Sequence, residues 1–159
     1  MMIFTFYILL NSAVVLFLWK YKKKNIHILE VLVYWLFAGI LYQNYSALLY
    51  MNFKLIIIPD TLSLEMAHFI NRTVLYPVFT ILFLNHFIRL QSAGKKIALI
   101  LSYVVLFNGL EGLADWLGVL MHTKWKLWWS FSFWIIYLLL SIGFMKFFRM
   151  KLKEELQPA

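Results

Sequence analysis

Hydrophobic residues along this chain are gathered into five long runs, which short basic or polar segments separate. The runs cover residues 2–19, 26–50, 66–90, 97–121 and 127–147. Each run has about the 17–25 residues that an α-helix needs to cross a hydrocarbon core of ~30 Å. Lipid tolerates only a backbone that satisfies its own hydrogen bonds, so we expect helices here and not strands or loops. The pattern predicts an all-α fold, a transmembrane bundle of five helices.

The composition agrees with a membrane protein and argues against a separate soluble domain. Hydrophobic residues make up 64% of the chain and charged residues only 14%, whereas soluble domains are about half apolar and a quarter charged. Little sequence remains outside the five runs, so we expect a single transmembrane domain over residues 1–159 that ends in a short, frayed basic tail at 148–159. The chain has no cysteine, which excludes disulfides and cysteine-ligated metal sites.

The basic residues predict an orientation for the bundle. Eleven of the fifteen Lys and Arg would lie on one side of a five-helix bundle: Lys20, Lys22, Lys23, Lys24, Arg89, Lys95, Lys96, Lys146, Arg149, Lys151 and Lys153. Basic residues in short loops stay in the cytoplasm, so we expect the N-terminus outside and the C-terminus in the cytoplasm. A nucleic-acid-binding protein would carry its basic residues on one face or stripe. The net charge of +8 therefore indicates a lipid bilayer as partner and not a nucleic acid.

The fourth run contains the acidic residues that lie furthest from the ends of a predicted helix. Glu111 and Asp115 are four residues apart, and Asn108 precedes Glu111 by three, so all three share one helical face. A charged residue at the centre of a membrane helix costs ~2.5–3.5 kcal/mol, so this face should turn toward the bundle interior. We take Glu111, Asp115 and Asn108 as candidates for a substrate or proton site, with Glu111 near the middle of its helix.

A second polar cluster is predicted at the outer end of the third run. Glu65, His68 and Arg72 are spaced three and then four residues apart, which places them on one helical face. Counted from the centres of their runs, Arg72 and Asp115 lie at the same depth, about 9 Å outward. We therefore expect an ion pair between these two side chains.

Two further features concern the packing of the helices. Glu30 and His86 lie at matching depths toward the inner end, which predicts a polar pair there. Such intramembrane pairs often only fix the way in which helices pack. Pro77, inside the third run, should bend its helix and free a backbone carbonyl.

Several chemistries are absent from the sequence. It contains no phosphate-binding or dinucleotide-binding glycine loop, no HExxH zinc motif and no GxSxG nucleophile motif. His68 and His86 are expected near opposite surfaces, too far apart to share a metal ion. We therefore predict no metal, no cofactor and no catalytic residues, and the sequence favours a role other than that of an enzyme.

Segments in the second half of the chain resemble a known group. The segment 74–80 with Asn85 and His86, and the segments 109–111 and 125–131, resemble a family of small uncharacterised multi-spanning membrane proteins of spore-forming Firmicutes. The resemblance covers about residues 70–135. It implies a bacterial plasma membrane and no assigned biochemistry. The positions that carry it are Tyr76, Pro77, Glu111, Trp125, Trp129 and Ser130.

Three functions fit these observations. The first is an accessory or structural membrane protein that forms a homo-oligomer or joins a larger membrane complex, with its polar residues setting the helix packing. The second is a small proton-coupled carrier or permease that uses Glu111 and Asp115, although five helices do not divide into the two equal repeats that many transporters use. The third is an intramembrane enzyme that acts on lipid, with Glu111 as general acid or base.

Overall fold

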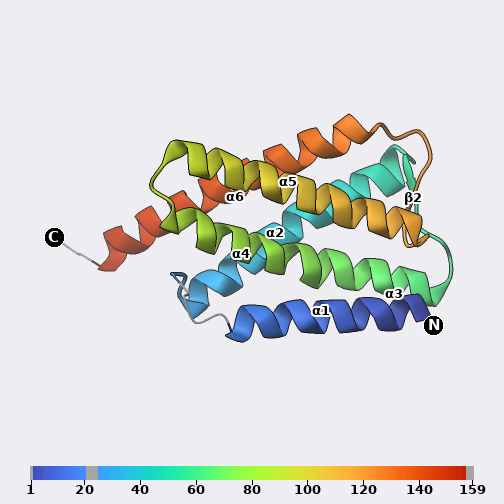
Figure 1. Cartoon of the computed structure of the whole chain (residues 1–159), viewed down its shortest axis with the longest axis horizontal. Coiled ribbons are helices and arrows are strands. Elements are labelled where there is room, and N and C mark those ends of the chain that lie inside the picture. Colours follow the sequence, from blue (N-terminus) through green and yellow to red (C-terminus); the bar gives the residue numbers. More distant parts are fainter. Residues whose placement is uncertain (1, 21–24, 157–159) are drawn as a thin grey trace.

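The computed structural model describes residues 2–20 and 25–156 and forms an all-helical bundle (Figure 1). The predicted all-α fold with five helices is confirmed. Two of the five helices contain a π-helical turn, named η1 and η2. The elements are α1 (Met2–Lys20), α2 (Ile28–Ala47) continued by η1 (Leu48–Asn52), α3 (Leu62–Ile70) continued by η2 (Asn71–Leu75) and α4 (Tyr76–Arg89), α5 (Ala93–Trp116) and α6 (Leu127–Leu156).

The start of α1 and the end of α6 lie at opposite ends of the bundle (Figure 1). We call these the N-terminal end and the C-terminal end of the bundle. Four of the helices are long and apolar enough to cross a membrane: Met2–Lys20, Leu62–Arg89, Ala93–Trp116 and Leu127–Glu155. The helix formed by α2 is not among them, because Glu30 and the polar sequence Tyr42-Gln43-Asn44-Tyr45 lower its mean hydropathy.

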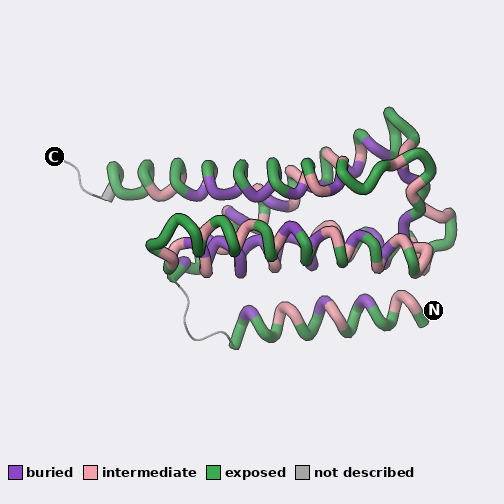
Figure 2. Tube along the Cα trace, turned by 45° about the horizontal axis from the view of Figure 1, so that its top comes forward, coloured by how far each residue is buried: buried purple, intermediate pink, exposed green. Residues whose placement is uncertain are grey.

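Helix α4 lies at the centre of the bundle, where it contacts α1, α2, α5 and α6. Its side chains are buried over most of its length. By contrast, α1 packs at the edge against α3 and α4, and only Tyr7, Asn11 and Leu18 on it are buried (Figure 2). The Asn11 side-chain amide donates to the side-chain oxygen of Asn71 at 3.2 Å, which joins α1 to η2.

Aromatic side chains fill the interior between α2, α4, α5 and α6. The indole of Trp134, which is fully buried, lies 5.4 Å from the ring of Tyr42, 5.0 Å from that of Tyr76 and 4.6 Å from that of Phe107, measured between ring centres. Tyr137 contacts Trp134 edge-on at 5.4 Å. Each such pair contributes about 0.5–1.5 kcal/mol beyond its buried area. Close packing of this kind holds helices together where lipid removes the hydrophobic driving force between them.

Several predicted helix limits differ from the structure. The third helix begins at Leu62, four residues before the predicted run, and the fourth ends at Trp116, five residues before its predicted end. The fourth helix stops there because Gly118 adopts a left-handed conformation with φ +69°, and Val119 N–H donates back to the Ala114 carbonyl at 2.8 Å. Glu111 consequently lies near the end of α5, and its predicted position near the middle of the helix is wrong.

The C-terminal segment also differs from the prediction. Helix α6 continues to Leu156, so most of the predicted basic tail at 148–159 is helical. Lys, Arg, Met, Leu and Glu all favour the helix, and the Lys151 ammonium pairs with the Glu154 carboxylate at 2.7 Å. Residues 157–159 of the predicted tail lie outside the described residues.

The bend predicted at Pro77 takes the form of a local change in the helix. Pro77 has no N–H to bond with the carbonyl of Thr73, four residues earlier. The indole Nε1 of Trp35 on α2 donates to that carbonyl at 2.8 Å. The π-turn η2 directly precedes this point. The freed carbonyl thus joins the third helix of the bundle to the second.

A short antiparallel pairing of two strands, which the sequence did not predict, closes the N-terminal end. Strand β1 (Ile56–Ile57) pairs antiparallel with β2 (Met121–His122), with Ile56 opposite His122. The Thr123 N–H also donates to the Leu55 carbonyl at 3.1 Å. This pairing ties the connection between α2 and α3 to that between α5 and α6, and it fixes the position of His122.

Candidate functional site

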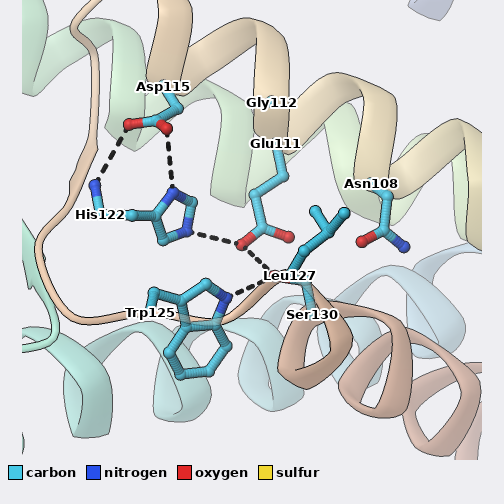
Figure 3. Close-up of a pocket in the computed structure, with 8 residues that line it drawn as sticks. All are labelled: Asn108, Glu111, Gly112, Asp115, His122, Trp125, Leu127 and Ser130. Atoms are coloured by element: carbon cyan, nitrogen blue, oxygen red, sulfur yellow. Dashed lines mark hydrogen bonds and ion pairs between the residues drawn. The ribbon is translucent and has the colours of Figure 1, made fainter.

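The polar face of α5 opens into a pocket of about 180 Å³ at the N-terminal end of the bundle (Figure 3). The pocket contains all three residues predicted for this face, so the expectation that they share one face of a helix agrees with the structure. Its lining consists of Asn108, Glu111, Gly112, Asp115, His122, Trp125, Leu127 and Ser130.

The Glu111 carboxylate accepts hydrogen bonds from two other elements. Its Oε1 accepts from Ser130 Oγ on α6 at 3.0 Å and lies 3.0 Å from Nε2 of His122 on β2. Its Oε2 accepts from the indole Nε1 of Trp134 on α6 at 2.8 Å. Glu111 is only 4% exposed. A buried carboxylate is costly unless it is hydrogen-bonded and paired, and here both oxygens have partners.

His122 lies between the two carboxylates (Figure 3), a role that sequence reasoning missed. Its Nε2 faces Glu111, and its Nδ1 lies 3.3 Å from Oδ2 of Asp115. The backbone N–H of His122 donates to the other Asp115 oxygen at 3.1 Å. A protonated imidazole donates from both ring nitrogens, so the imidazolium form satisfies both acids at once.

The charge state of His122 reflects two opposing effects. Burial lowers the pKa of His122, but the hydrogen bonds and charges of Glu111, followed by those of Asp115, outweigh it and raise the pKa above its ordinary value of 6.5. The imidazole also stacks on the ring of Trp125, with 6.1 Å between the ring centres. The site therefore favours a positive charge between two negative ones.

We expect the stability contributed by His122 to fall as the pH rises. The pKa of His122 in the folded protein is above its unfolded value of about 6.5. The contribution is therefore fully present below that value and is lost as the pH rises through the raised pKa. The check is the melting temperature of the detergent-solubilised wild type and of His122→Asn, measured between about pH 5 and pH 9. The difference between the two proteins should shrink with increasing pH.

The matched control for this experiment is His27→Asn. His27 is exposed and caps the start of α2, and asparagine serves equally well as an N-cap. His27 contacts neither Glu111 nor Asp115, so its substitution should not reproduce the difference expected for His122→Asn. A difference between wild type and His122→Asn that stays constant or grows as the pH rises would contradict the pairing of His122 with the two acids.

Ser130 connects Trp125 to the acidic site. The indole Nε1 of Trp125 donates to Ser130 Oγ at 2.6 Å, and Ser130 in turn donates to Glu111. Three positions that carry the family resemblance are thus in contact. Among the described residues, the recorded side-chain partners of the Ser130 hydroxyl are the Trp125 indole and the Glu111 carboxylate.

Asn108 lines the pocket beside Glu111. Its side-chain amide donates to the Val104 carbonyl at 2.8 Å, whereas its side-chain oxygen is buried without a partner among the described residues. That oxygen is an acceptor available to a small donor in the pocket.

The predicted ion pair between Arg72 and Asp115 is wrong. Asp115 bonds with His122, because α5 ends one residue after Asp115 and the following turn brings β2 back to it. Arg72 lies on η2, which contacts α1 and α2. Glu65, His68 and Arg72 do line one pocket at the N-terminal end, as their spacing indicated.

The predicted pair of Glu30 with His86 is also wrong. The Glu30 carboxylate binds Arg149, with Nε to Oε1 at 2.6 Å and Nη2 to Oε2 at 3.2 Å. It also accepts from Tyr34 Oη at 2.9 Å. Arg149 reaches Glu30 because α6 continues well past residue 147. The planar guanidinium of Arg149 forms a bidentate pair with the carboxylate, with one hydrogen bond to each oxygen. His86 Nδ1 lies 3.5 Å from Tyr103 Oη.

The two carboxylates contact different nitrogens of the His122 ring, Nε2 for Glu111 and Nδ1 for Asp115. The three side chains therefore do not point toward a common position that a metal ion could occupy. Within residues 2–20 and 25–156, no group of three or more His, Asp or Glu side chains is placed to hold a metal ion.

A comparison of the chain with protein-family models, with curated proteins and with solved structures finds no match.

Proposed function

We propose that the chain is an accessory or structural protein of a bacterial plasma membrane, with its N-terminal end outside and its C-terminal end in the cytoplasm. Four helices of sufficient length and apolarity support the membrane location. The concentration of Lys and Arg toward the C-terminal end supports the orientation. The resemblance to membrane proteins of spore-forming Firmicutes supports the choice of membrane.

The observation that carries the accessory role is the aromatic layer between the two polar ends. Glu111 and Glu30 lie toward opposite ends, and the rings of Tyr76, Phe107 and Trp134 fill the interior between the helices with exposures of 0–2%. A solute or proton crossing the bundle would have to displace these rings. Interiors packed in this way deform little, so the fold suits a rigid partner better than a carrier.

The polar residues then serve to join elements. Glu111 connects α5 to β2 and α6, while Glu30 connects α2 to α6. We infer that this fixed framework acts as a homo-oligomer or as a subunit of a larger membrane complex. The lipid-facing sides of α1 and α5, which are mostly exposed, are the surfaces available for such contacts.

Proteoliposomes test this function. With a pH-sensitive dye inside and a potassium diffusion potential applied, proton flux should equal that of protein-free vesicles, and Glu111→Gln should leave both flux and assembly unchanged. Assembly is measured by native mass spectrometry of the detergent-extracted protein, which should detect an oligomer or a stoichiometric partner. A proton flux above the protein-free level that Glu111→Gln removes would contradict the accessory role.

A proton-coupled carrier is the second candidate, and one observation favours it. The imidazole of His122 bridges two carboxylates beside a pocket, an arrangement that can exchange protons with the solution. For this function the aromatic layer would have to open during a transport cycle. The flux measurement above separates the two candidates directly.

A further inference from the structure

A second pocket, of about 380 Å³, lies at the N-terminal end between the last turns of α2 with η1 and the helix formed by α3 and η2. Its polar lining includes Ser46, Tyr50, Glu65, His68 and Arg72. The pocket is separate from the Glu111 site, with which it shares no lining residue. Its other walls are largely apolar and include two methionines and Phe69.

The guanidinium of Arg72 lacks a directly bonded carboxylate among the described residues. Among the described residues no carboxylate forms an ion pair with it, and its Nε is buried without a hydrogen-bond acceptor. Its Cζ lies 5.4 Å from the centre of the Phe69 ring, and the carboxylate of Glu65 interacts with the guanidinium only from beyond ion-pair distance. A partly buried cation without a directly bonded carboxylate is unfavourable. The pocket therefore offers a place for an anion.

The backbone supplies an independent indication. Both helices that border the pocket change from α to π geometry beside it: η1 carries Tyr50, and η2 carries Arg72. In each turn a backbone N–H donates to the carbonyl five residues earlier. These hydrogen bonds run from Phe53 N–H to the Leu48 carbonyl and from Tyr76 N–H to the Asn71 carbonyl. Single π-turns inside α-helices occur frequently at functional sites. The turn η2, which carries Arg72, lies inside its helix, whereas η1 ends the second helix.

The remaining polar groups limit the charge of the ligand. His68 is buried and its Nε2 lies 3.3 Å from Ser46 Oγ, so this pair adds neutral hydrogen-bonding groups. Glu65 is exposed and lines the same pocket. Its negative charge disfavours an anion with two charges. One guanidinium, neutral donors and apolar walls suit a group with a single negative charge and an apolar part.

We propose that this pocket binds a phosphodiester monoanion through Arg72, supplied by a phospholipid headgroup or by a soluble diester. Arg is suited to this role because its fork of N–H donors matches the oxygens of a phosphate. The apolar wall of the pocket favours the lipid as source, because glycerol and acyl carbons have contacts there. The soluble source does not depend on the membrane location proposed above.

The experiment measures binding to the full chain in detergent by native mass spectrometry. The probes are phosphatidylglycerol and a diacylglycerol with the same acyl chains, which lacks the phosphodiester. Wild type should retain phosphatidylglycerol and not diacylglycerol, and Arg72→Gln should lower the affinity for phosphatidylglycerol at least about tenfold. Lys126→Gln is the matched control, because it removes an exposed positive charge outside the pocket. It should bind like wild type.

Dimethyl phosphate tests the soluble source. If phosphatidylglycerol is not retained, dimethyl phosphate should raise the melting temperature of wild type and not that of Arg72→Gln. If Arg72→Gln does not fold, Arg72→Lys replaces it in the experiment. Lysine keeps the positive charge but lacks the paired N–H donors of the guanidinium, so this variant should bind the phosphodiester several-fold more weakly. Equal binding of both probes by wild type and the Arg72 variants overturns the proposal, as does an absence of binding by wild type.

Discussion

Replacing Glu111 by alanine should destabilise the folded protein by about 3–5 kcal/mol, the range measured when one partner of a buried ion pair is removed. The substitution leaves Ser130 and Trp134 without their acceptor and His122 without its more buried counter-charge. The measurement is unfolding of the purified protein in mixed micelles with increasing sodium dodecyl sulfate, followed by tryptophan fluorescence.

Two matched variants separate this effect from a general sensitivity of α5. Glu111→Gln retains an acceptor oxygen and should lose about 1–2 kcal/mol, as expected for a hydrogen bond weakened by removal of the charge. Asp115→Asn alters the acid whose side chain is 41% exposed, and it should lose less than about 1 kcal/mol. If Glu111→Ala were no more destabilising than Asp115→Asn, Glu111 would not hold these elements together.

Replacing Arg149 by methionine should cost about 3 kcal/mol at the C-terminal end of the bundle. The variant leaves the carboxylate of Glu30, which is 5% exposed, without its cation. It also removes the hydrogen bond of 2.7 Å from Arg149 Nη2 to the Asn25 carbonyl. The same unfolding measurement applies. The expected loss is large because α2 and α6 are joined here by a charge pair in a mostly apolar setting.

The double variant Glu30→Gln with Arg149→Met should be more stable than Arg149→Met alone, since it no longer contains a buried, unpaired carboxylate. Lys151→Met serves as the control, because Lys151 and Glu154 form an exposed pair with side chains 56% and 55% exposed. Such pairs contribute about 0–1 kcal/mol. Strictly additive losses in the double variant would argue against direct coupling between Glu30 and Arg149.

The five helices followed from the sequence because their hydrophobic runs are long and are separated by charged segments. Their limits followed less well, since a helix end depends on single residues. Gly118, for example, stops α5 through its left-handed conformation, although the hydrophobic run continues past it. The paired strands β1 and β2 have only two residues each and leave no periodic signal in the sequence.

The face shared by Asn108, Glu111 and Asp115 could be predicted because it depends only on spacing within one helix. The role of His122 could not, because it depends on a turn that reverses the chain and on a strand pairing with residue 56. One signal was present: His122 is one of only four histidines, and it follows closely after the run that contains both acids.

The predicted pairs between helices failed for a different reason. Matching depths along two helices do not determine which faces of those helices meet. Arg72 and Asp115 turn toward different neighbours, and Glu30 finds its partner on the extended α6. The rotation of each helix about its axis is set by the packing of the whole interior, here by large aromatic side chains. The number of residues between a side chain and the centre of its helix gives its depth but not this rotation.

The most direct test of the central claim, a membrane-spanning bundle with the Glu111 site outside, uses the absence of cysteine from the chain. Single cysteines are introduced at two exposed positions at opposite ends of the bundle, Asp60→Cys and Gln91→Cys. A membrane-impermeant maleimide should label intact cells only through Asp60→Cys, and it should label Gln91→Cys only after the membrane is opened. Labelling of Gln91→Cys in intact cells, or protection of Asp60→Cys there, would contradict the account.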